Sequence, residues 1–269
     1  MYSRLLARVF ATPDAPWVLK GGTASLMRIP DARTTNDVDL LAQADDLEAA
    51  VVELRRALEV DLGDHFHFRV TGTEPNVGGE GQPHVRGVRV KVQAYCGTRA
   101  ANPLFGIDIV TGSLMTAEPD EIVDGALEVR GIDPPRVRVY PVVDHIADKL
   151  CATMTQYRTA DSGRTKDLVD LVVFACKEQV DGSALTLAIH AEWGHRNLPG
   201  TARFAPPSSW AAIYPALARK TPACEVTSWA GATSIVTDLL DPALNRAAAG
   251  QVWSPTLRVW SPGPAAPSE

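Results

Sequence analysis

Apolar and polar positions along the chain form two kinds of pattern, one with the period of a helix and one with that of a strand. Residues 47–58 carry a leucine-rich apolar side with charged residues outside it, which predicts an amphipathic helix with an acidic cap. Apolar and polar residues alternate over residues 65–70, and residues 88–95 and 104–110 have the same strand-like character. The polar, Gly-rich residues 72–87 between them predict a hairpin loop.

The two ends of the chain differ from this strand-rich middle. Residues 2–10 predict a short helix, and the apolar residues 17–19 predict a brief strand. In the second half the spacing is helical, and it predicts helices over residues 144–154, 164–174 and 185–193. Another helix is expected to open with Ser208 or Ser209 as its cap.

Composition narrows the class of protein. With 269 residues, 45% of them hydrophobic and 22% charged, the chain can bury a sizeable core in one large domain or two lobes. No apolar run approaches the roughly 20 residues that span a bilayer, and no signal-peptide pattern is present, so we expect a cytoplasmic protein without a membrane partner. The four cysteines are widely spaced, which favours buried thiols over zinc or disulfides. The net charge of -6 argues against non-specific coating of nucleic acid.

Candidate chemistry begins at a pair of glycines. Gly21 and Gly22 follow the first predicted strand and allow a tight turn, and the helix predicted from Thr23 would present free N–H groups that suit phosphate. Further along, Asp37 and Asp39 stand two apart in a strand-like run, so both carboxylates project from one face. Adjacent carboxylates repel unless a cation lies between them, and hard oxygen ligands suit Mg²⁺. This combination predicts nucleotide chemistry.

The order of these features resembles the signature of the DNA polymerase β-like nucleotidyltransferase superfamily. Two pairs of longer motifs are similar to one branch of it, the AbiEii/AbiGii toxin family, which includes the MenT toxins. The first pair is Leu19-Lys-Gly-Gly-Thr-Ala and Arg33-x-Thr35-x-Asp37-Val-Asp39-Leu40. The second pair is Ala147-Asp-Lys149-Leu-x-Ala and Arg164-x-Lys166-Asp167-Leu-x-Asp170-Leu.

The resemblance implies an α+β fold. A polymerase β-like nucleotidyltransferase core, with a mixed and mostly antiparallel sheet flanked by helices, is expected over residues 1–138. A helical lobe that closes the active-site cleft is expected over residues 139–261, and residues 262–269 are expected to form a flexible tail.

Asp108 is the candidate for a third metal-binding carboxylate. It stands between Ile107 and Ile109 in a predicted strand, where an acid must be paired, solvated or bound to metal. A water-facing acid on an edge strand is the alternative reading of this position. The resemblance implies instead that Asp108 joins Asp37 and Asp39 as a ligand of Mg²⁺ or Mn²⁺ and accepts a proton from the attacking hydroxyl.

The remaining site residues come from the resemblance. It implies nucleotide-binding roles for a set of small and basic residues: Gly21, Gly22, Thr23, Arg33, Thr35, Lys149 and Lys166. It also implies an essential acid on the helix after residue 164, and we favour Asp170 over Asp167. The alternative for this helix is an ordinary ladder of surface ion pairs, worth under about 1 kcal/mol.

The implied function is that of a toxin in a toxin–antitoxin system. It would transfer a nucleoside monophosphate, from a pyrimidine triphosphate, to the 3′ end of tRNA and so block translation. Its partners would be a nucleoside triphosphate, tRNA and a cognate winged-helix antitoxin of the AbiEi kind. Two alternatives stay open: a nucleotidyltransferase that modifies a small molecule such as an aminoglycoside, and a non-catalytic protein that binds a nucleotide or a partner.

Residues nearer the C-terminus have weaker claims. Arg196 is the candidate there for contact with substrate, although a surface arginine is the default reading of this position. Trp210 and Tyr214, four residues apart, favour core packing over a base-stacking platform. His65 and His67 share a predicted strand face and are expected to lie at the surface without a metal.

Overall fold

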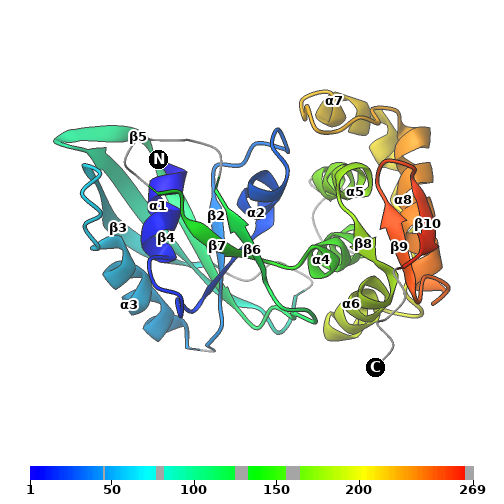
Figure 1. Ribbon diagram of the computed structural model, residues 1–269, viewed down its shortest axis with the longest axis horizontal. Helices are drawn as coiled ribbons and strands as arrows, with labels where there is room; N and C mark the ends of the chain where they lie inside the picture. The colour runs from blue at the N-terminus through cyan, green and yellow to red at the C-terminus, as the bar shows by residue number, and fades with distance from the viewer. Residues whose placement is uncertain (45, 77–81, 125–132, 156–163, 264–269) are drawn as a thin grey trace. The chain divides into compact units, whose positions relative to one another are not determined.

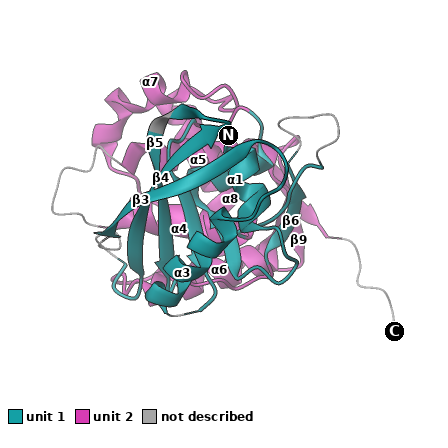
Figure 2. Ribbon diagram, turned by 90° about the vertical axis from the view of Figure 1, so that its left-hand side faces the viewer, with its two compact units in different colours: residues 1–30, 34–113, 119–140 teal, residues 31–33, 114–118, 141–269 magenta. Residues whose placement is uncertain are grey.

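The chain folds into two compact units (Figures 1 and 2). A computed structural model describes residues 1–44, 46–76, 82–124, 133–155 and 164–263. Unit 1 comprises residues 1–30, 34–113 and 119–140, and unit 2 comprises residues 31–33, 114–118 and 141–269. Since unit 2 takes two short segments from within the first half of the chain, the predicted boundary between residues 138 and 139 stays a prediction.

Unit 1 is built on a mixed sheet. Its described residues form seven strands in the order β3-β4-β5-β2-β1-β7-β6. The strands are β1 (Trp17–Lys20), β2 (Val38–Ala42), β3 (Phe66–Asn76), β4 (Arg86–Cys96), β5 (Arg99–Thr111), β6 (Asp120–Val123) and β7 (Arg136–Val139). The β1–β7 and β2–β5 pairs are parallel, and the other neighbours are antiparallel. The helices are α1 (Tyr2–Val9), α2 (Gly21–Arg28) and α3 (Leu47–Leu58). The predicted α+β class is confirmed.

One face of this sheet is apolar and forms the core of unit 1. Because side chains alternate along a strand, Val38 and Leu40 of β2 lie on the same face as Ile107 and Ile109 of β5. All four are fully buried, and they belong to one cluster with the apolar sides of α1 and α3. The carboxylates at odd positions of β2 and even positions of β5 therefore lie on the opposite face.

Two buried arginines fix α1 to the start of β3. Arg4 Nε donates to Asp64 Oδ2 over 2.6 Å, and Arg8 Nη2 donates to Asp64 Oδ1 over 2.7 Å. Burial alone would raise the pKa of Asp64, but the hydrogen bonds from Arg8 and Arg4 outweigh it and hold that pKa well below its ordinary value. Asp64 is thus an ionised side chain in the interior that depends on both partners.

Unit 2 is helical with a small sheet of its own. Its elements are α4 (Val142–Met154), α5 (Thr165–Lys177), β8 (Val180–Asp181), α6 (Gly182–His195), the 3₁₀ helix η2 (Ser208–Ala212), α7 (Tyr214–Ala218), α8 (Trp229–Leu244), β9 (Gln251–Ser254) and β10 (Val259–Pro262). Helix α4 packs on α5 and α6, and α8 packs on the same two helices. Strands β8, β9 and β10 form an antiparallel sheet (Figure 1). No helix in the described ranges has the length and apolar character needed to cross a membrane.

The structure corrects several details of the prediction. Residues up to Asn76 belong to β3, where a hairpin loop was predicted from Gly72, and residues 77–81 of that loop lie outside the described residues. Neither serine caps η2, because Pro207 occupies the N-cap position. Trp210 and Tyr214 are buried, which confirms core packing. Of the predicted tail, residues 264–269 lie outside the described part, and Pro262 ends β10.

We predict that Asp64→Asn destabilises the protein, because it leaves two buried guanidinium groups without their anion. The free energy of unfolding at pH 7 should fall by about 3–5 kcal/mol in denaturant titrations. The folded pKa of Asp64 lies below the unfolded value of about 3.9, so this contribution is present above that pH and is lost as the pH falls further. The difference between the two proteins should narrow below about pH 4.

The matched control for this test is Asp14→Asn, since Asp14 is an exposed aspartate in the same unit. It should unfold like the original protein at every pH. Equal unfolding curves for Asp64→Asn and Asp14→Asn at pH 7 would contradict the role assigned to the pair of arginines.

Candidate active site

The parallel pairing of β2 and β5 brings two predicted metal ligands together. Asp39 and Asp108 are register partners on neighbouring strands, and both lie on the sheet face opposite the core. Asp37 stands two residues before Asp39, just ahead of β2, and is half-buried. We call Asp37, Asp39 and Asp108 the carboxylate cluster. Its members come from positions 37 to 108, and the sheet makes them neighbours.

The cluster already contains a cation that was not predicted from the sequence. Arg89 of β4 is the antiparallel register partner of Asp108. Its Nε donates to Asp108 Oδ1 over 2.7 Å and its Nη2 donates to Asp108 Oδ2 over 2.6 Å. The same Nη2 lies 3.7 Å from Asp37 Oδ2. These contacts raise the pKa of the Arg89 guanidinium, and they explain how Asp108, only 6% exposed, is accommodated among apolar residues.

The glycine turn supports the cluster from the side of α2. Gly21 has a φ of +66°, a left-handed conformation, and a Cβ added there would lie 1.9 Å from Asp39 Oδ2. A Cβ on Gly22 would lie 2.9 Å from the Cβ of Thr35. Thr23 Oγ1 donates to the carbonyl oxygen of Asp37 over 2.8 Å. The predicted phosphate-binding residues of unit 1 therefore lie together, and they hold both aspartates in place.

The donor chemistry of the cluster suits a divalent cation. Three carboxylates on one sheet face are hard oxygen ligands, and a guanidinium already lies between two of them as a stand-in for positive charge. As the side chains lie here, no three acidic, His or Cys residues in the described ranges form a group that could hold a metal ion. Asp37, Asp39 and Asp108 would be the residues to hold one, with Arg89 shifted from its present contacts.

Unit 2 contains a second group of charges, which involves the other predicted site residues. Lys149 of α4 is buried, and its Nζ lies 2.8 Å from Asp167 and 2.9 Å from Asp170 of α5. Arg33 pairs with Asp170 at 3.3 Å, and Arg164 pairs with Asp167 at 3.2 Å. We call these five residues the ion cluster. Since it joins three cations to two acids, it carries excess positive charge.

The alternative reading of this helix, a ladder of surface ion pairs, does not fit the structure, because the acids of the ion cluster are buried. Asp167 and Asp170 are 1% and 5% exposed, so neither is a solvated surface acid. Burial would lower the pKa of Lys149, but Asp167 and Asp170 raise it well above its ordinary value. Burial would raise the pKa of Asp170, but Lys149 and Arg33 lower it. Lys166 beside this cluster is exposed over part of its surface. Loss of water around its ammonium group, together with the charges of Lys149 and Arg33, lowers its pKa.

Arg196 is not available to a substrate, contrary to the prediction. Its side chain is fully buried, with Nε 2.6 Å from Glu192 Oε1 and Nη2 2.7 Å from Asp148 Oδ1. The i,i+4 spacing places Glu192 and Arg196 on one side of α6, where they join α6 to α4. The sequence pattern, an arginine after a helix, gave no sign that Glu192 and Asp148 would surround the Arg196 side chain.

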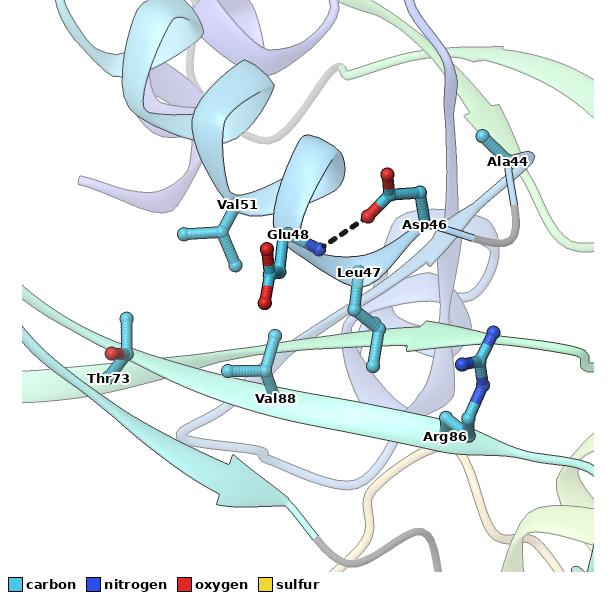
Figure 3. A pocket seen from close by; sticks show the side chains of 8 residues that line it. All are labelled: Ala44, Asp46, Leu47, Glu48, Val51, Thr73, Arg86 and Val88. Carbon is cyan, nitrogen blue, oxygen red and sulfur yellow. Dashed lines mark hydrogen bonds between the residues drawn. The ribbon is translucent and has the colours of Figure 1, made fainter.

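An open hollow of about 960 Å³ lies elsewhere on unit 1 (Figure 3). Leu47 and Val51 of α3 line it on one side, and Arg86 and Val88 of β4 line it on the other. Val88 lies on the core face of the sheet and Arg89 on the opposite face. The hollow is therefore separate from the carboxylate cluster.

Comparisons with known proteins show which family the chain belongs to. A family model described as "Nucleotidyl transferase AbiEii toxin, Type IV TA system" matches residues 4–232. The chain belongs to this family. The protein is thus an AbiEii nucleotidyltransferase, the toxin of a type IV toxin–antitoxin system, with a nucleoside triphosphate as substrate and an antitoxin as partner. Enzymes of this family generally use a divalent metal ion.

One solved structure shows the same fold at low sequence identity, and two others are given after it for comparison. The AbiEii toxin is similar to MenT4, a nucleotidyltransferase toxin from Mycobacterium tuberculosis, with 20% identity, a TM-score of 0.52, and coverage of 92% of this chain and 85% of that one. A putative nucleotidyltransferase from Helicobacter pylori gives 15% identity and a TM-score of 0.48, covering 91% and 92%. JHP933 from the same organism has 14% sequence identity and a TM-score of 0.46, and the match covers 91% of this chain and 90% of that one. The comparison with curated proteins gave no match.

We predict that Gly21→Ala displaces Asp39, because the new Cβ would overlap its carboxylate. The control is Gly63→Ala, since Gly63 has the same φ of +66° with no atom within 4 Å of an added Cβ. Gly63→Ala should cost about 1–2 kcal/mol of unfolding free energy from backbone strain alone. Gly21→Ala should cost clearly more, and a crystal structure should show Asp39 moved. Equal losses for the two variants would contradict the close packing.

Proposed function

We propose that the AbiEii toxin transfers a nucleoside monophosphate to the 3′ end of tRNA with Mg²⁺ held by the carboxylate cluster. The observation that carries this proposal is the pairing of Asp39 with Asp108 on one polar sheet face, with Arg89 bound across Asp108. Carboxylates in this arrangement need a positive partner, and a cation that also binds triphosphate oxygens suits the reaction of the family. Mn²⁺ is the alternative ion.

The proposed roles in unit 1 follow the positions of the side chains. Asp37 and Asp39 would bind the metal, and Gly21, Gly22 and Thr23 would leave room for the triphosphate beside the start of α2. A bound divalent cation would neutralise the triphosphate and stabilise the charge that develops on pyrophosphate as it leaves. Asp108, the most buried of the three acids, would accept the proton of the attacking 3′ hydroxyl.

Unit 2 would supply positive charge for the triphosphate. We assign this role to Arg33 and Lys149 of the ion cluster, which holds more cations than acids, and to Lys166 beside it. Asp170 holds both Lys149 and Arg33, whereas Asp167 holds Lys149 and Arg164. Asp170 is therefore our candidate for the essential acid, as the residue that positions both proposed triphosphate ligands. Thr35, which packs on Gly22, would support the turn.

The acceptor and the antitoxin are further parts of the proposal. A pyrimidine nucleotide added to the 3′ end of tRNA would prevent charging with an amino acid and stop translation. A winged-helix antitoxin of the AbiEi kind is the proposed partner. The support for both is kinship with the AbiEii and MenT toxins.

We expect the purified toxin to incorporate label from a pyrimidine triphosphate into tRNA in the presence of Mg²⁺. Asp39→Asn and Asp108→Asn should each lower the rate by at least about a hundredfold, because each removes charge that acts on the transition state. Asp14→Asn, an exposed aspartate of the same unit, should retain the original rate. Thermal unfolding of each variant checks that it is folded.

The same assay distinguishes the other candidate acceptors. Each of the four labelled triphosphates should be tested with tRNA and, separately, with aminoglycosides. If a small molecule is labelled and tRNA is not, tRNA is not the acceptor and the small molecule takes its place in the proposal. A folded Asp39→Asn variant with the original rate would contradict the metal site itself.

We predict that Lys166→Gln raises the KM for the triphosphate by about fivefold to tenfold and leaves kcat nearly unchanged. The reason is that an exposed lysine beside the ion cluster would attract substrate and transition state alike. Lys177→Gln is the matched control, since Lys177 lies on the same helix and pairs with Glu225 at 2.5 Å. Steady-state kinetics at fixed tRNA concentration measure both constants. An unchanged KM in Lys166→Gln would remove this lysine from the proposed nucleotide site.

A further inference from the structure

Arg89 holds a position that the mechanism above does not use. Its guanidinium makes two parallel hydrogen bonds to Asp108, of 2.7 Å and 2.6 Å, and reaches to 3.7 Å from Asp37. The planar fork of an arginine matches both oxygens of a carboxylate, which makes this kind of pair strong and directional. Both oxygens of Asp108 are therefore engaged by Arg89, although a bound metal ion would require at least one of them.

The register of the sheet places Arg89 next to Asp108. Arg89, Asp108 and Asp39 are successive register partners across β4, β5 and β2, so their side chains form a row on one face. A Cβ on Gly106 would lie 3.2 Å from Arg89 Nε and 3.3 Å from Asp37 Oδ1. Because Gly106 has no side chain, the Arg89 guanidinium and the Asp37 carboxylate can both lie close to its backbone.

Charge explains why a cation is needed at this place. Three aspartates in the carboxylate cluster repel each other, and Asp108 is largely shielded from water. Arg89 supplies one positive charge, with its side chain 39% exposed and therefore free on one side to move. A divalent ion would supply two positive charges to the same oxygens, so ion and guanidinium would be alternatives at Asp108.

We propose that Arg89 is a built-in counter-cation of the carboxylate cluster. It pairs with Asp108 and Asp37 when no divalent ion is bound, and it competes with that ion for the oxygens of Asp108. Arg89 is thus a positioning residue that keeps the ligands in place and sets the affinity for the metal. This inference rests on the metal site of the proposed function.

The test measures metal binding and stability without any nucleotide. Mn²⁺ binding is followed by calorimetry and by electron paramagnetic resonance, in the original protein and in Arg89→Gln. Removing the competitor should tighten Mn²⁺ binding by about tenfold, the size expected for a charged hydrogen-bonded pair. In EDTA, Arg89→Gln should melt at a lower temperature than the original protein. Saturating Mn²⁺ should remove most of this difference in melting temperature, because the ion replaces the missing positive charge.

Lys91→Gln is the matched control. Lys91 lies two residues further on the same face of β4, and it pairs with Glu74 at 2.5 Å rather than with the cluster. Its loss removes one positive charge from this face without releasing Asp108. The proposal requires that Lys91→Gln bind Mn²⁺ like the original protein. If it binds as tightly as Arg89→Gln, general electrostatics accounts for the effect and the proposal is overturned.

Other outcomes separate this inference from the proposed function. If Asp39→Asn abolishes Mn²⁺ binding but Arg89→Gln leaves the affinity unchanged, the metal site stands and the role of Arg89 is overturned. If the original protein binds no Mn²⁺ and the Asp39→Asn variant transfers nucleotide normally, the metal site fails and the inference fails with it. Should Arg89→Gln not fold, Arg89→Lys keeps the charge and loses the fork, and it should still bind Mn²⁺ more tightly than the original protein does.

Discussion

The parallel pairing of β2 with β5 is the constraint on which the carboxylate cluster of unit 1 depends. It makes Asp39 and Asp108 neighbours while Val38, Leu40, Ile107 and Ile109 fill the core behind them. A slip of one residue in either strand would exchange its two faces, burying a carboxylate and exposing apolar core residues. The hydrophobic free energy that holds the sheet together therefore also fixes the backbone positions of the acids.

Each unit contains a cluster of charged side chains, and the net charges of the two clusters are opposite in sign. The carboxylate cluster has more acids than cations, and Arg89 covers only part of the excess. The ion cluster has more cations than acids, with Lys149 held between two buried aspartates. An acid excess attracts cations and a cation excess attracts anions, so the two clusters differ in the kind of ligand that each would attract.

Much of the fold follows from sequence pattern, whereas the ionic partners do not. Alternation and helical spacing predicted the strands around Asp108 and the helices that carry Lys149 and Asp170. Arg89 could not be assigned, because its contact with Asp108 depends on the register of β4 against β5, including a bulge between Val92 and Ala94. The burial of Arg196 was missed for a related reason, since one of its acids comes from another helix. The small sheet of β8 to β10 joins strands of two to four residues, which are too short to show a period.

The path of the chain between the units limits how they can be separated. Unit 2 includes residues 31–33 and 114–118, and both segments are tied into it: Arg33 to Asp170, and the backbone N–H of Thr116 to the carboxylate of Asp144. A single cut near residue 140 would leave the C-terminal piece without these partners and would expose Asp144 and Asp170. Unit 1 is therefore not a module that a single cut at that point would separate cleanly from unit 2.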